Sequence, residues 1–250
     1  EMLPLVTKPL IQYGVEEALA AGITGMAIVT GRGKRAIEDH FDISYELENE
    51  IAGSDKESLL DSTRELIERC SFSYTRQNQM LGLGHAILVG ESLIGNEPFA
   101  VLLADDFCLN EADPVLAQMV ALYAEHRCCI VAVEEVPMDQ VSRYGIISGR
   151  EQSPGLYRVE KMVEKPEPEI APSNLAIIGR YLLTPDIFSA LRATSPGLNG
   201  EIQLTDALQA LAVKGEVLAT TFEGTRYDCG SVDGYIEATK VLYKRSLSRQ

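Results

Sequence analysis

The sequence predicts an α/β fold in which a Rossmann-like, mixed and mostly parallel sheet is flanked by helices. Short apolar segments alternate with helical segments up to residue 133, as in a doubly wound sheet. The clearest of these segments is Phe99–Asp106, in which six apolar residues are followed by two aspartates. A wholly apolar run of this length is typical of a strand buried on both faces of a parallel sheet. Beyond residue 133, longer strands follow one another with little helix between them, which indicates an antiparallel or mixed portion.

Proline, glycine and apolar spacing predict the elements of the first half. Pro9 and Gly22 enclose an apolar-periodic segment and predict a helix, because proline favours a helix start and glycine a helix end. A break near Gly53 divides the segment 45–69 into two helices. The other predicted strands cover 26–30, 72–76, 99–104 and 129–133, and the other helices 34–40, 83–93 and 113–126.

The second half is predicted to be richer in strands. Strands are expected over 144–147, 156–163, 175–183 and 217–222, and helices over 186–193, 203–213 and 233–247. No repeat, low-complexity tract or linker interrupts the chain. We therefore expect a single domain over residues 1–250.

The composition limits the partners and the location of the protein. The net charge of −15 leaves no basic footprint, which argues against nucleic acid as a partner. The longest uncharged apolar stretches are far shorter than the roughly 20 residues that span a bilayer, so no membrane association is expected. The cysteines form no C-x-x-C pair, which indicates reduced thiols in a cytoplasmic protein and argues against a disulfide framework or metal cluster. They are Cys70, Cys108, Cys128, Cys129 and Cys229.

Asp105 and Asp106 directly follow a predicted strand. Ligands of open α/β sheets bind outside the carboxyl ends of the strands, and carboxylate oxygens there suit a Mg²⁺ ion that holds phosphates. A strand-terminal aspartate is also an ordinary cap or turn residue, and Asn110 and Asp113 indicate a loop in either case. Taken alone, these residues leave both interpretations open.

Two glycine-containing segments invite a phosphate-binding interpretation. Thr30–Lys34 lacks the G-x-x-x-x-G-K-[ST] spacing of a P-loop, so a surface turn is favoured there. Gln77–Ala86 follows a predicted strand and opens a predicted helix, and Gly82 and Gly84 allow backbone N–H groups to approach a ligand. This segment does not match G-x-G-x-x-G, and a simple strand-to-helix turn explains it equally well.

Charged residues mark the ends of two later strands. Lys165 precedes Pro166, which predicts an extended residue that projects its ammonium group as a fixed charge. Glu164 and Lys165 are neighbours on a strand and are expected to point to opposite sides, so that they do not neutralise each other. Asp228 follows a strand and precedes a turn at Gly230. Solvated charges and a turn aspartate are the simpler interpretations of these residues.

The order and spacing of these segments resemble bacterial UTP–glucose-1-phosphate uridylyltransferases, also called UDP-glucose pyrophosphorylases. The resemblance extends from Glu1 to about Tyr243, nearly the whole chain. The insertion over 42–69 favours this family over the related thymidylyltransferases and adenylyltransferases. The matching motifs are Glu1–Pro4, Lys8–Tyr13, Val29–Phe41, Leu81–Ala86, Leu103–Asp106, Arg143–Gly145, Val163–Pro166, Pro172–Ile177, Gly200–Asp206 and Arg226–Gly230.

The resemblance implies a nucleotidyltransferase fold with a nucleotide-binding half over 1–135 and a sugar-phosphate-binding half over 136–250. It also implies that UTP and glucose 1-phosphate react to UDP-glucose and pyrophosphate, with Mg²⁺ as cofactor, in a homodimer or homotetramer. The sugar phosphate would attack the α-phosphate in line and is already an oxyanion, so no general base is needed. Mg²⁺ and a lysine would act by positioning and charge compensation.

For the nucleotide and the metal, the resemblance implies roles for five residues. Gln77 and the backbone of Gly82 would read the edge of the uracil, with Glu1 near the nucleotide. Asp105 and Asp228 would bind Mg²⁺ and belong to the catalytic group.

For the sugar phosphate, the resemblance implies a second set of residues. Gly145 and Glu164 would bind sugar hydroxyls, helped by the backbone near Ile177 and by Glu201. Lys165 would hold the phosphate and complete the catalytic group. No covalent intermediate is required in such a reaction.

The chain departs from the family pattern before Glu1. Family members carry a first strand, a glycine-rich loop with an arginine, and a lysine there, and these groups hold the triphosphate. Because Met26–Thr30 and Phe99–Ala104 need a neighbouring strand, we expect about 20 further residues that form a central strand and this loop. Ala104 also replaces a proline that is common before the first metal aspartate.

Two other functions stay open at the level of the sequence. A non-catalytic sugar-nucleotide-binding paralogue would lack the glycine-rich loop. A metal-dependent glycosyltransferase has a similar fold and needs an Asp-x-Asp motif, which Asp105 and Asp106 do not form. It would also leave Glu164–Pro166 without a role.

Overall fold

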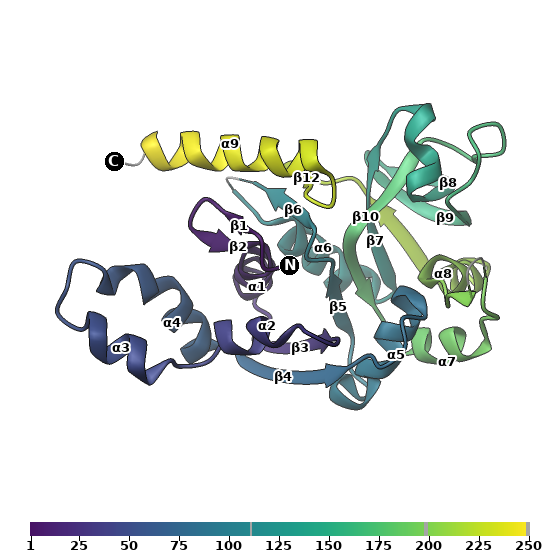
Figure 1. Ribbon diagram of the computed structural model, residues 1–250. Helices are drawn as coiled ribbons and strands as arrows, with labels where there is room; N and C mark the ends of the chain where they lie inside the picture. The colour runs from purple at the N-terminus through teal and green to yellow at the C-terminus, as the bar shows by residue number, and fades with distance from the viewer. Residues whose placement is uncertain (111, 198–199, 249–250) are drawn as a thin grey trace.

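The computed structural model describes residues 1–110, 112–197 and 200–248, whose arrangement is shown in Figure 1. The helices are α1 (Leu10–Ala20), α2 (Arg35–His40), α3 (Tyr45–Ile51), α4 (Asp61–Arg69), α5 (Gly82–Ile94), α6 (Val115–His126), α7 (Asp186–Ala193), α8 (Leu204–Ala212) and α9 (Val232–Ser248), with 3₁₀ turns η1 (Glu57–Leu60) and η2 (Met138–Arg143). The strands are β1 (Pro4–Leu5), β2 (Lys8–Pro9), β3 (Gly25–Thr30), β4 (Ser71–Arg76), β5 (Phe99–Leu102), β6 (Asp106–Leu109), β7 (Cys129–Glu135), β8 (Gly145–Ser153), β9 (Leu156–Glu164), β10 (Leu175–Leu183), β11 (Val217–Thr220) and β12 (Thr225–Asp228). Each helix and strand predicted from the sequence is present. Within these described ranges, no helix combines the length and apolarity that crossing a bilayer requires.

A six-stranded sheet with the order β5-β10-β7-β11-β9-β8 forms the centre of the molecule, and β10 also pairs with β8. The pairs β1–β2, β3–β4 and β6–β12 form separate two-stranded sheets. Among the described strands, β3–β4 and β7–β11 pair in parallel and the other ladders are antiparallel. The predicted mixed sheet with flanking helices is confirmed, with fewer parallel pairs than expected. Hairpins such as β8–β9, which turns at Pro154–Gly155, are antiparallel by geometry.

β7 is buried on both faces, as are its neighbours β10 and β11. Val131 and Val133 pack in one cluster with residues of α7 and α8. Ile130 and Ala132, on the opposite face, pack with residues of α1 and α6. The sequence analysis expected this position for Phe99–Ala104, and that expectation is wrong. β5 is only half-buried, because β10 is its one partner strand within the described residues.

The open edges of β3 and β5 bear on the expected additional strand. Within the described residues, β3 pairs only with β4, and β5 pairs only with β10. Each of these strands therefore keeps one edge without a strand partner in this part of the chain. A further strand between them stays a prediction.

The ladder between β6 and β12 was not expected from the sequence pattern. Each of its strands has four residues, too few for a clear alternation of apolar and polar side chains. The ladder places Asp228 directly opposite Asp106. It thereby aligns the end of β12 with the loop between β5 and β6.

Arg180 on β10 connects several of these elements from inside the core, where its side chain is 2% exposed. Its Nη2 donates to Glu17 Oε2 on α1 and to the Asp106 carbonyl, both at 2.8 Å. Its Nη1 donates to the Leu103 carbonyl at 3.3 Å. Glu17 Oε1 in turn accepts from the Leu116 N–H at the start of α6, at 3.1 Å. One buried ion pair therefore links α1, α6, β10 and the β5–β6 loop.

Arg180→Met should lower the free energy of unfolding by about 3–5 kcal/mol, because it leaves the Glu17 carboxylate buried without a positively charged partner. Urea unfolding measures the change. Arg69→Ala is a charge-matched control, since Arg69 pairs with Glu65 at the surface and should contribute less than about 0.5 kcal/mol. Combining Arg180→Met with Glu17→Gln should recover part of the loss. Equal unfolding curves for the Arg180 and Arg69 variants would contradict this account.

Candidate functional site

Asp105 and Asp228 lie side by side at the ends of two chain segments. Asp105 is exposed in the β5–β6 loop, and Asp228 is the last residue of β12. The Cys229 N–H donates to the Asp105 carbonyl at 2.8 Å. Asp105 Oδ2 and Asp228 Oδ1 are each 3.1 Å from the position that a Cβ on Gly230 would take. The two carboxylate oxygens are therefore no farther apart than twice that distance.

This pair of carboxylates fits a divalent cation that is shared with a phosphate ligand. Mg²⁺ prefers oxygen ligands and is commonly held by one or two carboxylates together with water and substrate phosphates. Glycine at position 230 leaves the space between the two carboxylates free of a side chain. Arg143 Nη2 donates to Asp228 Oδ2 at 2.8 Å and offsets part of the local negative charge. Across the described residues, no group of three or more His, Cys, Asp or Glu is suited to a metal, so the protein supplies no complete cage.

Asp106, next in the sequence, holds the loop in place. Its carboxylate is buried and accepts from the Gly179 N–H at 2.5 Å and from Arg226 Nε at 2.6 Å. Burial raises the pKa of the Asp106 carboxyl, and the Arg226 guanidinium opposes the rise. A Cβ on Gly179 would lie 2.6 Å from Asp106 Oδ2, so no larger residue fits there. The two adjacent aspartates therefore have different surroundings and different roles.

Gly145, Glu164 and Ile177 meet where β8, β9 and β10 adjoin. Gly145 and Glu164 are direct partners in the β8–β9 ladder. A Cβ on Gly145 would lie 3.1 Å from Ile177 Cδ1 and 3.2 Å from Glu164 Oε2. The structure thus brings together three of the residues that were predicted to bind the sugar. It adds Thr205, whose Oγ1 donates to Glu164 Oε2 at 2.6 Å.

Lys165 lies beside this group in a conformation that was not predicted. Its φ of 45° is in the left-handed region, whereas an extended backbone was expected before Pro166. Its Nζ is 3.8 Å from Glu164 Oε1, so the two neighbours pair instead of pointing apart. Both predictions are wrong because β9 ends at Glu164 and the Lys165 N–H donates to the Tyr144 carbonyl at 2.9 Å. Left-handed backbone at a non-glycine residue costs on the order of 1–3 kcal/mol and is concentrated at functional sites.

Gln77 and Gly82 meet at the start of α5. Gln77 Nε2 donates to the Gly82 carbonyl at 3.1 Å and lies 3.0 Å from His85 Nδ1. Gly82 has a φ of 87°, and a Cβ there would lie 2.9 Å from Glu201 Cβ. The structure therefore places Glu201 against this loop, and its predicted contact with the sugar stays a prediction.

Glu1, the remaining predicted site residue, forms an ion pair with Lys34. Its Oε1 is 3.3 Å from Lys34 Nζ, in the turn that follows β3. The two charges stabilise the chain before β1 against that turn. The predicted position of Glu1 near a nucleotide is not tested by this contact.

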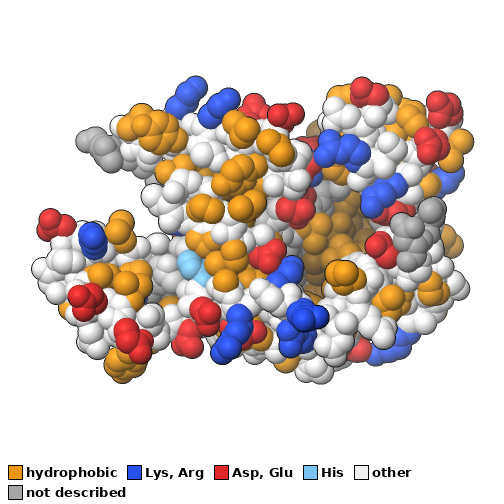
Figure 2. Space-filling model, in the orientation of Figure 1, with side chains coloured by type: hydrophobic (Ala, Val, Ile, Leu, Met, Phe, Trp, Pro, Cys, Tyr) orange, Lys and Arg blue, Asp and Glu red, His pale blue; other side chains and the backbone are white. Residues whose placement is uncertain are grey.

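Arg143 connects the carboxylate pair with the group around Glu164. It bonds to Asp228 and is two positions before Gly145. Tyr181 of β10 is buried, and its pKa is raised by burial and further by the negative charges of Glu164, Asp106 and Asp105. Figure 2 shows a hollow between the β6–β12 side of the molecule and α8, with hydrophobic side chains on its floor and charged side chains around it. The hollow lies between β12, which ends at Asp228, and α8, which carries Thr205.

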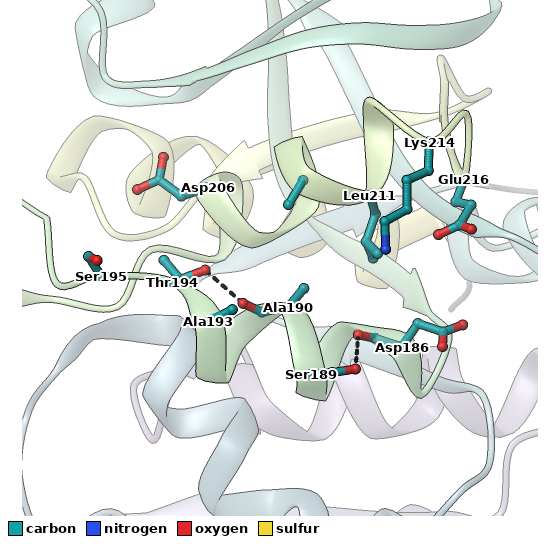
Figure 3. A pocket seen from close by; sticks show the side chains of 11 residues that line it. Asp186, Ser189, Ala190, Ala193, Thr194, Ser195, Asp206, Leu211, Lys214 and Glu216 are labelled. Carbon is teal, nitrogen blue, oxygen red and sulfur yellow. Dashed lines mark hydrogen bonds between the residues drawn. The ribbon is translucent and has the colours of Figure 1, made fainter.

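A separate pocket of about 620 Å³ lies between α7 and α8 (Figure 3). No predicted site residue is among its described lining residues. Two of its hydroxyl groups bond to carbonyls of α7, since Thr194 Oγ1 donates to the Ala190 carbonyl at 2.9 Å and Ser189 Oγ to the Asp186 carbonyl at 3.1 Å. The pocket is therefore not part of the candidate site.

The cysteines near the site are not prepared for nucleophilic attack. Cys229 adjoins Asp228 and is buried, and burial raises the pKa of its thiol to about 11. Burial likewise raises the pKa of the Cys108 thiol to about 12. Both groups are therefore protonated near neutral pH, and a thiolate is the reactive form of cysteine.

Arg143 and Thr205 are the site residues that the sequence analysis did not single out. Both lie inside motifs that carry the family resemblance, Arg143–Gly145 and Gly200–Asp206. Their partners are far along the chain: Asp228 is 85 positions from Arg143, and Glu164 is 41 positions from Thr205. Their place in these motifs was the one signal in the sequence that could have pointed to Arg143 and Thr205. No local pattern could have identified Asp228 and Glu164 as their partners.

Gly145→Ala should lower the free energy of unfolding by about 1–3 kcal/mol, because the added methyl overpacks the site. The new Cβ would lie 2.9 Å from Thr205 Oγ1 and 3.2 Å from Glu164 Oε2. Denaturant unfolding measures the change. Gly90→Ala on α5 is the matched control, since its Cβ would be 3.7 Å from Val29 Cγ2, an ordinary contact. If the Gly145→Ala variant unfolds like the wild-type protein, the site has room for a methyl group beside Thr205 and Glu164.

Comparison with known proteins agrees with this geometry. The profile of the nucleotidyl transferase family matches residues 1–245. A protein of Pseudomonas aeruginosa named UTP–glucose-1-phosphate uridylyltransferase is 64% identical over 245 residues, which cover 98% of this chain and 88% of the relative.

Solved structures give the same result. A crystal structure of apo UDP-glucose pyrophosphorylase matches with a TM-score of 0.95 and 60% identity, covering 98% of this chain and 90% of that one. A UDP-glucose pyrophosphorylase in complex with UDP-glucose matches with a TM-score of 0.91 and 58% identity, with the same coverage. The chain therefore belongs to the nucleotidyl transferase family, among the UTP–glucose-1-phosphate uridylyltransferases.

Proposed function

We propose that this chain transfers the uridylyl group of UTP to glucose 1-phosphate and forms UDP-glucose and pyrophosphate. The observation that carries the proposal is the convergence of Asp105 and Asp228 at Gly230, next to the group formed by Gly145 and Glu164. A pair of carboxylates that can share a divalent cation with phosphates suits a reaction between two phosphates. The names of the relatives and the complex of one of them with UDP-glucose also support it.

We propose Mg²⁺ as the cofactor, with Asp105 and Asp228 as its ligands. When bound, the ion would offset the negative charge of the phosphates. The hydrogen bond from Gly230 N–H to Asp228 Oδ1, at 3.1 Å, holds that carboxylate beside Asp105. The Cys229 N–H donates to the Asp105 carbonyl and so holds the Asp105 backbone next to the end of β12.

Lys165 and Glu164 would hold the sugar phosphate. The Lys165 side chain is 58% exposed, so its ammonium group can reach a phosphate in the hollow. Glu164 would accept hydrogen bonds from sugar hydroxyls, beside the backbone of Gly145 and Ile177, and Glu201 would assist. Because the sugar phosphate is already an oxyanion, these residues need only align it with the α-phosphate and compensate charge.

The nucleotide would bind at the start of α5, in the half formed by residues 1–135. Gln77 and the Gly82 backbone would read the uracil edge, and Glu1 would lie near the nucleotide. The Gln77–Gly82 hydrogen bond supports this assignment, since it fixes the loop before a ligand arrives. Residues 136–250 would form the sugar-phosphate half.

We also propose a cytoplasmic location and a homodimer or homotetramer. The free cysteines are consistent with a reducing compartment. The apolar side chains exposed on α9 would suit contact with a second copy of the chain. They are Val232, Ile236, Tyr243 and Leu247.

The purified protein should release pyrophosphate from UTP only when glucose 1-phosphate and a divalent cation are both present. Asp105→Asn should lower kcat by roughly 100-fold, with a much smaller effect on the KM for glucose 1-phosphate. The same variant should weaken Mn²⁺ binding, measured by electron paramagnetic resonance without substrates. Asp113→Asn, which changes an exposed carboxylate in the loop before α6, is the control. Unchanged Mn²⁺ binding in the Asp105 variant would argue against the metal site.

Lys165→Ala should raise the KM for glucose 1-phosphate and lower kcat, because the phosphate loses a positive charge in both the ground state and the transition state. Steady-state kinetics with varied glucose 1-phosphate measure both values. Lys161→Ala is the matched control, because it removes an exposed lysine of β9 four positions before Lys165. Equal kinetics for the two variants would mean that Lys165 is an ordinary solvated charge.

A further inference from the structure

Polar contacts at two positions of α8 hold this helix against β9. Thr205 and Gln209 are four positions apart and therefore lie on the same face of the helix. Thr205 bonds to Glu164 at the end of β9. Gln209 accepts from the Met162 N–H and donates to the Glu160 carbonyl at 3.4 Å. The helix therefore runs antiparallel to β9, with Thr205 at the end of the strand that carries Glu164.

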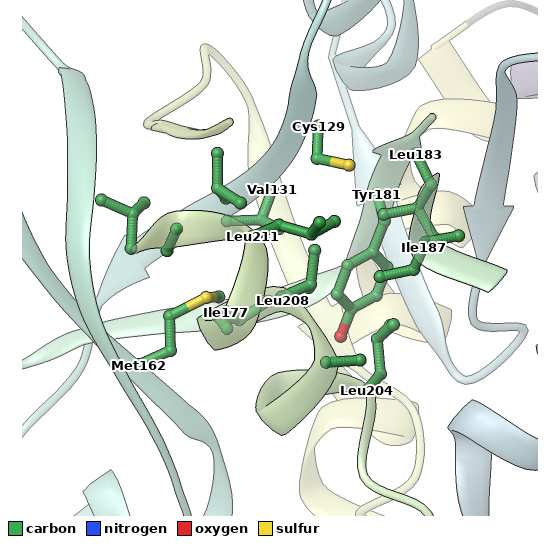
Figure 4. Close-up of a cluster of buried hydrophobic side chains, with 14 of the residues drawn as sticks. Cys129, Val131, Met162, Ile177, Tyr181, Leu183, Ile187, Leu204, Leu208 and Leu211 are labelled. Carbon is green, nitrogen blue, oxygen red and sulfur yellow. The ribbon is translucent and has the colours of Figure 1, made fainter. Parts of the chain in front are cut away.

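Apolar packing fixes the same arrangement. Leu204, Leu208 and Leu211 of α8 are at most 3% exposed. They belong to the cluster that contains Val131 and Met162, which Figure 4 shows around α8. Thr205 is thus attached to a rigid element and cannot move independently of β9.

The hydrogen bond from Thr205 leaves the two oxygens of Glu164 in different situations. Oε2 accepts from the Thr205 hydroxyl, which is buried. Oε1 has no hydrogen bond within the described residues, and Lys165 Nζ is 3.8 Å from it. The Oε2 side is closed by the backbone of Gly145, where a Cβ would lie 2.9 Å from Thr205 Oγ1. Oε1 is therefore the oxygen with more acceptor capacity left for a ligand.

We propose that Thr205 is a positioning residue that fixes the Glu164 carboxylate and so determines which sugar phosphates are accepted. The inference rests on the proposed function, in which Glu164 binds hydroxyls of glucose 1-phosphate. An ionised carboxylate has only acceptor oxygens, so a donor on one of them holds the side chain in one orientation. Oε1 then has a fixed place, and a sugar with one hydroxyl inverted cannot pair with it. A site built to pair with a hydroxyl of the substrate discriminates against an analogue that does not offer the hydroxyl at that place.

Thr205→Val tests the proposal, since it removes the hydroxyl and keeps the branched side chain. We expect the KM for glucose 1-phosphate to rise about ten- to hundredfold, as for loss of a hydrogen bond to a charged group. The KM for UTP should stay within about twofold, and the preference for glucose 1-phosphate over galactose 1-phosphate should fall. Thr205→Ser returns the hydroxyl and should recover most of the affinity and the preference.

Two controls separate positioning from folding. Thr194→Val removes a hydroxyl that bonds within α7 and should leave both KM values unchanged. In a double-mutant cycle with Glu164→Ala, the Thr205 substitution should have little further effect, because the acceptor of its hydrogen bond is gone. If the valine variant does not fold, Thr205→Ala with the same cycle provides the test.

The outcomes distinguish this inference from the proposed function. Equal rises of the KM values for UTP and glucose 1-phosphate, or a serine variant no better than valine, would overturn the role of Thr205. An unchanged KM for glucose 1-phosphate in the folded valine variant would do the same. Failure of the wild-type protein to form UDP-glucose would instead overturn the proposed function.

Discussion

The buried ion pair between Arg180 and Glu17 connects the elements on which the candidate site depends. A guanidinium removed from water is tolerated only if its donors find acceptors, and Nε, Nη1 and Nη2 of Arg180 all do. Two of these acceptors are the carbonyls of Leu103 and Asp106, which flank the segment that contains Asp105. The position of a candidate metal ligand therefore follows from an interaction in the core. The β5–β6 loop therefore both accepts hydrogen bonds from the buried Arg180 and carries the candidate ligand Asp105.

Close approach of carboxylates to glycine is the second constraint on the site. Asp106 lies against Gly179, and Glu164 lies against Gly145. Asp105 and Asp228 both lie beside Gly230. At each place a side chain on the glycine would occupy space next to the carboxylate. Because Gly179 has no side chain, Asp106 packs closely against the backbone in the core. Because Gly145 and Gly230 have none, the space beside the other carboxylates is not filled by a side chain at these positions.

The two parts of the site depend on different kinds of strand pairing. The proposed metal-binding part depends on the β6–β12 ladder, which joins distant segments and places Asp228 opposite Asp106. The proposed sugar-binding part depends on the β8–β9 hairpin, which is local and places Gly145 opposite Glu164. The hydrogen bond between Arg143 and Asp228 connects them. A ligand with a sugar and several phosphates would extend across both parts, which agrees with the proposed reaction.

The sequence by itself determined the helices, most of the strands and the family, because these follow from signals that act over a few residues. Pro9 and Gly22 bound α1, and the motif around Glu164 and Lys165 carries part of the resemblance. Tertiary structure alone decided which apolar strand is central, since β5 is wholly apolar yet only half-buried, whereas β7 ends in two glutamates and is buried over its first five residues. It also decided the different roles of adjacent aspartates, the left-handed backbone of Lys165 and the pairing of Thr205 with Glu164. The physical reason is that burial, ion pairing and close packing arise between residues far apart in the chain, and no local pattern records those partners.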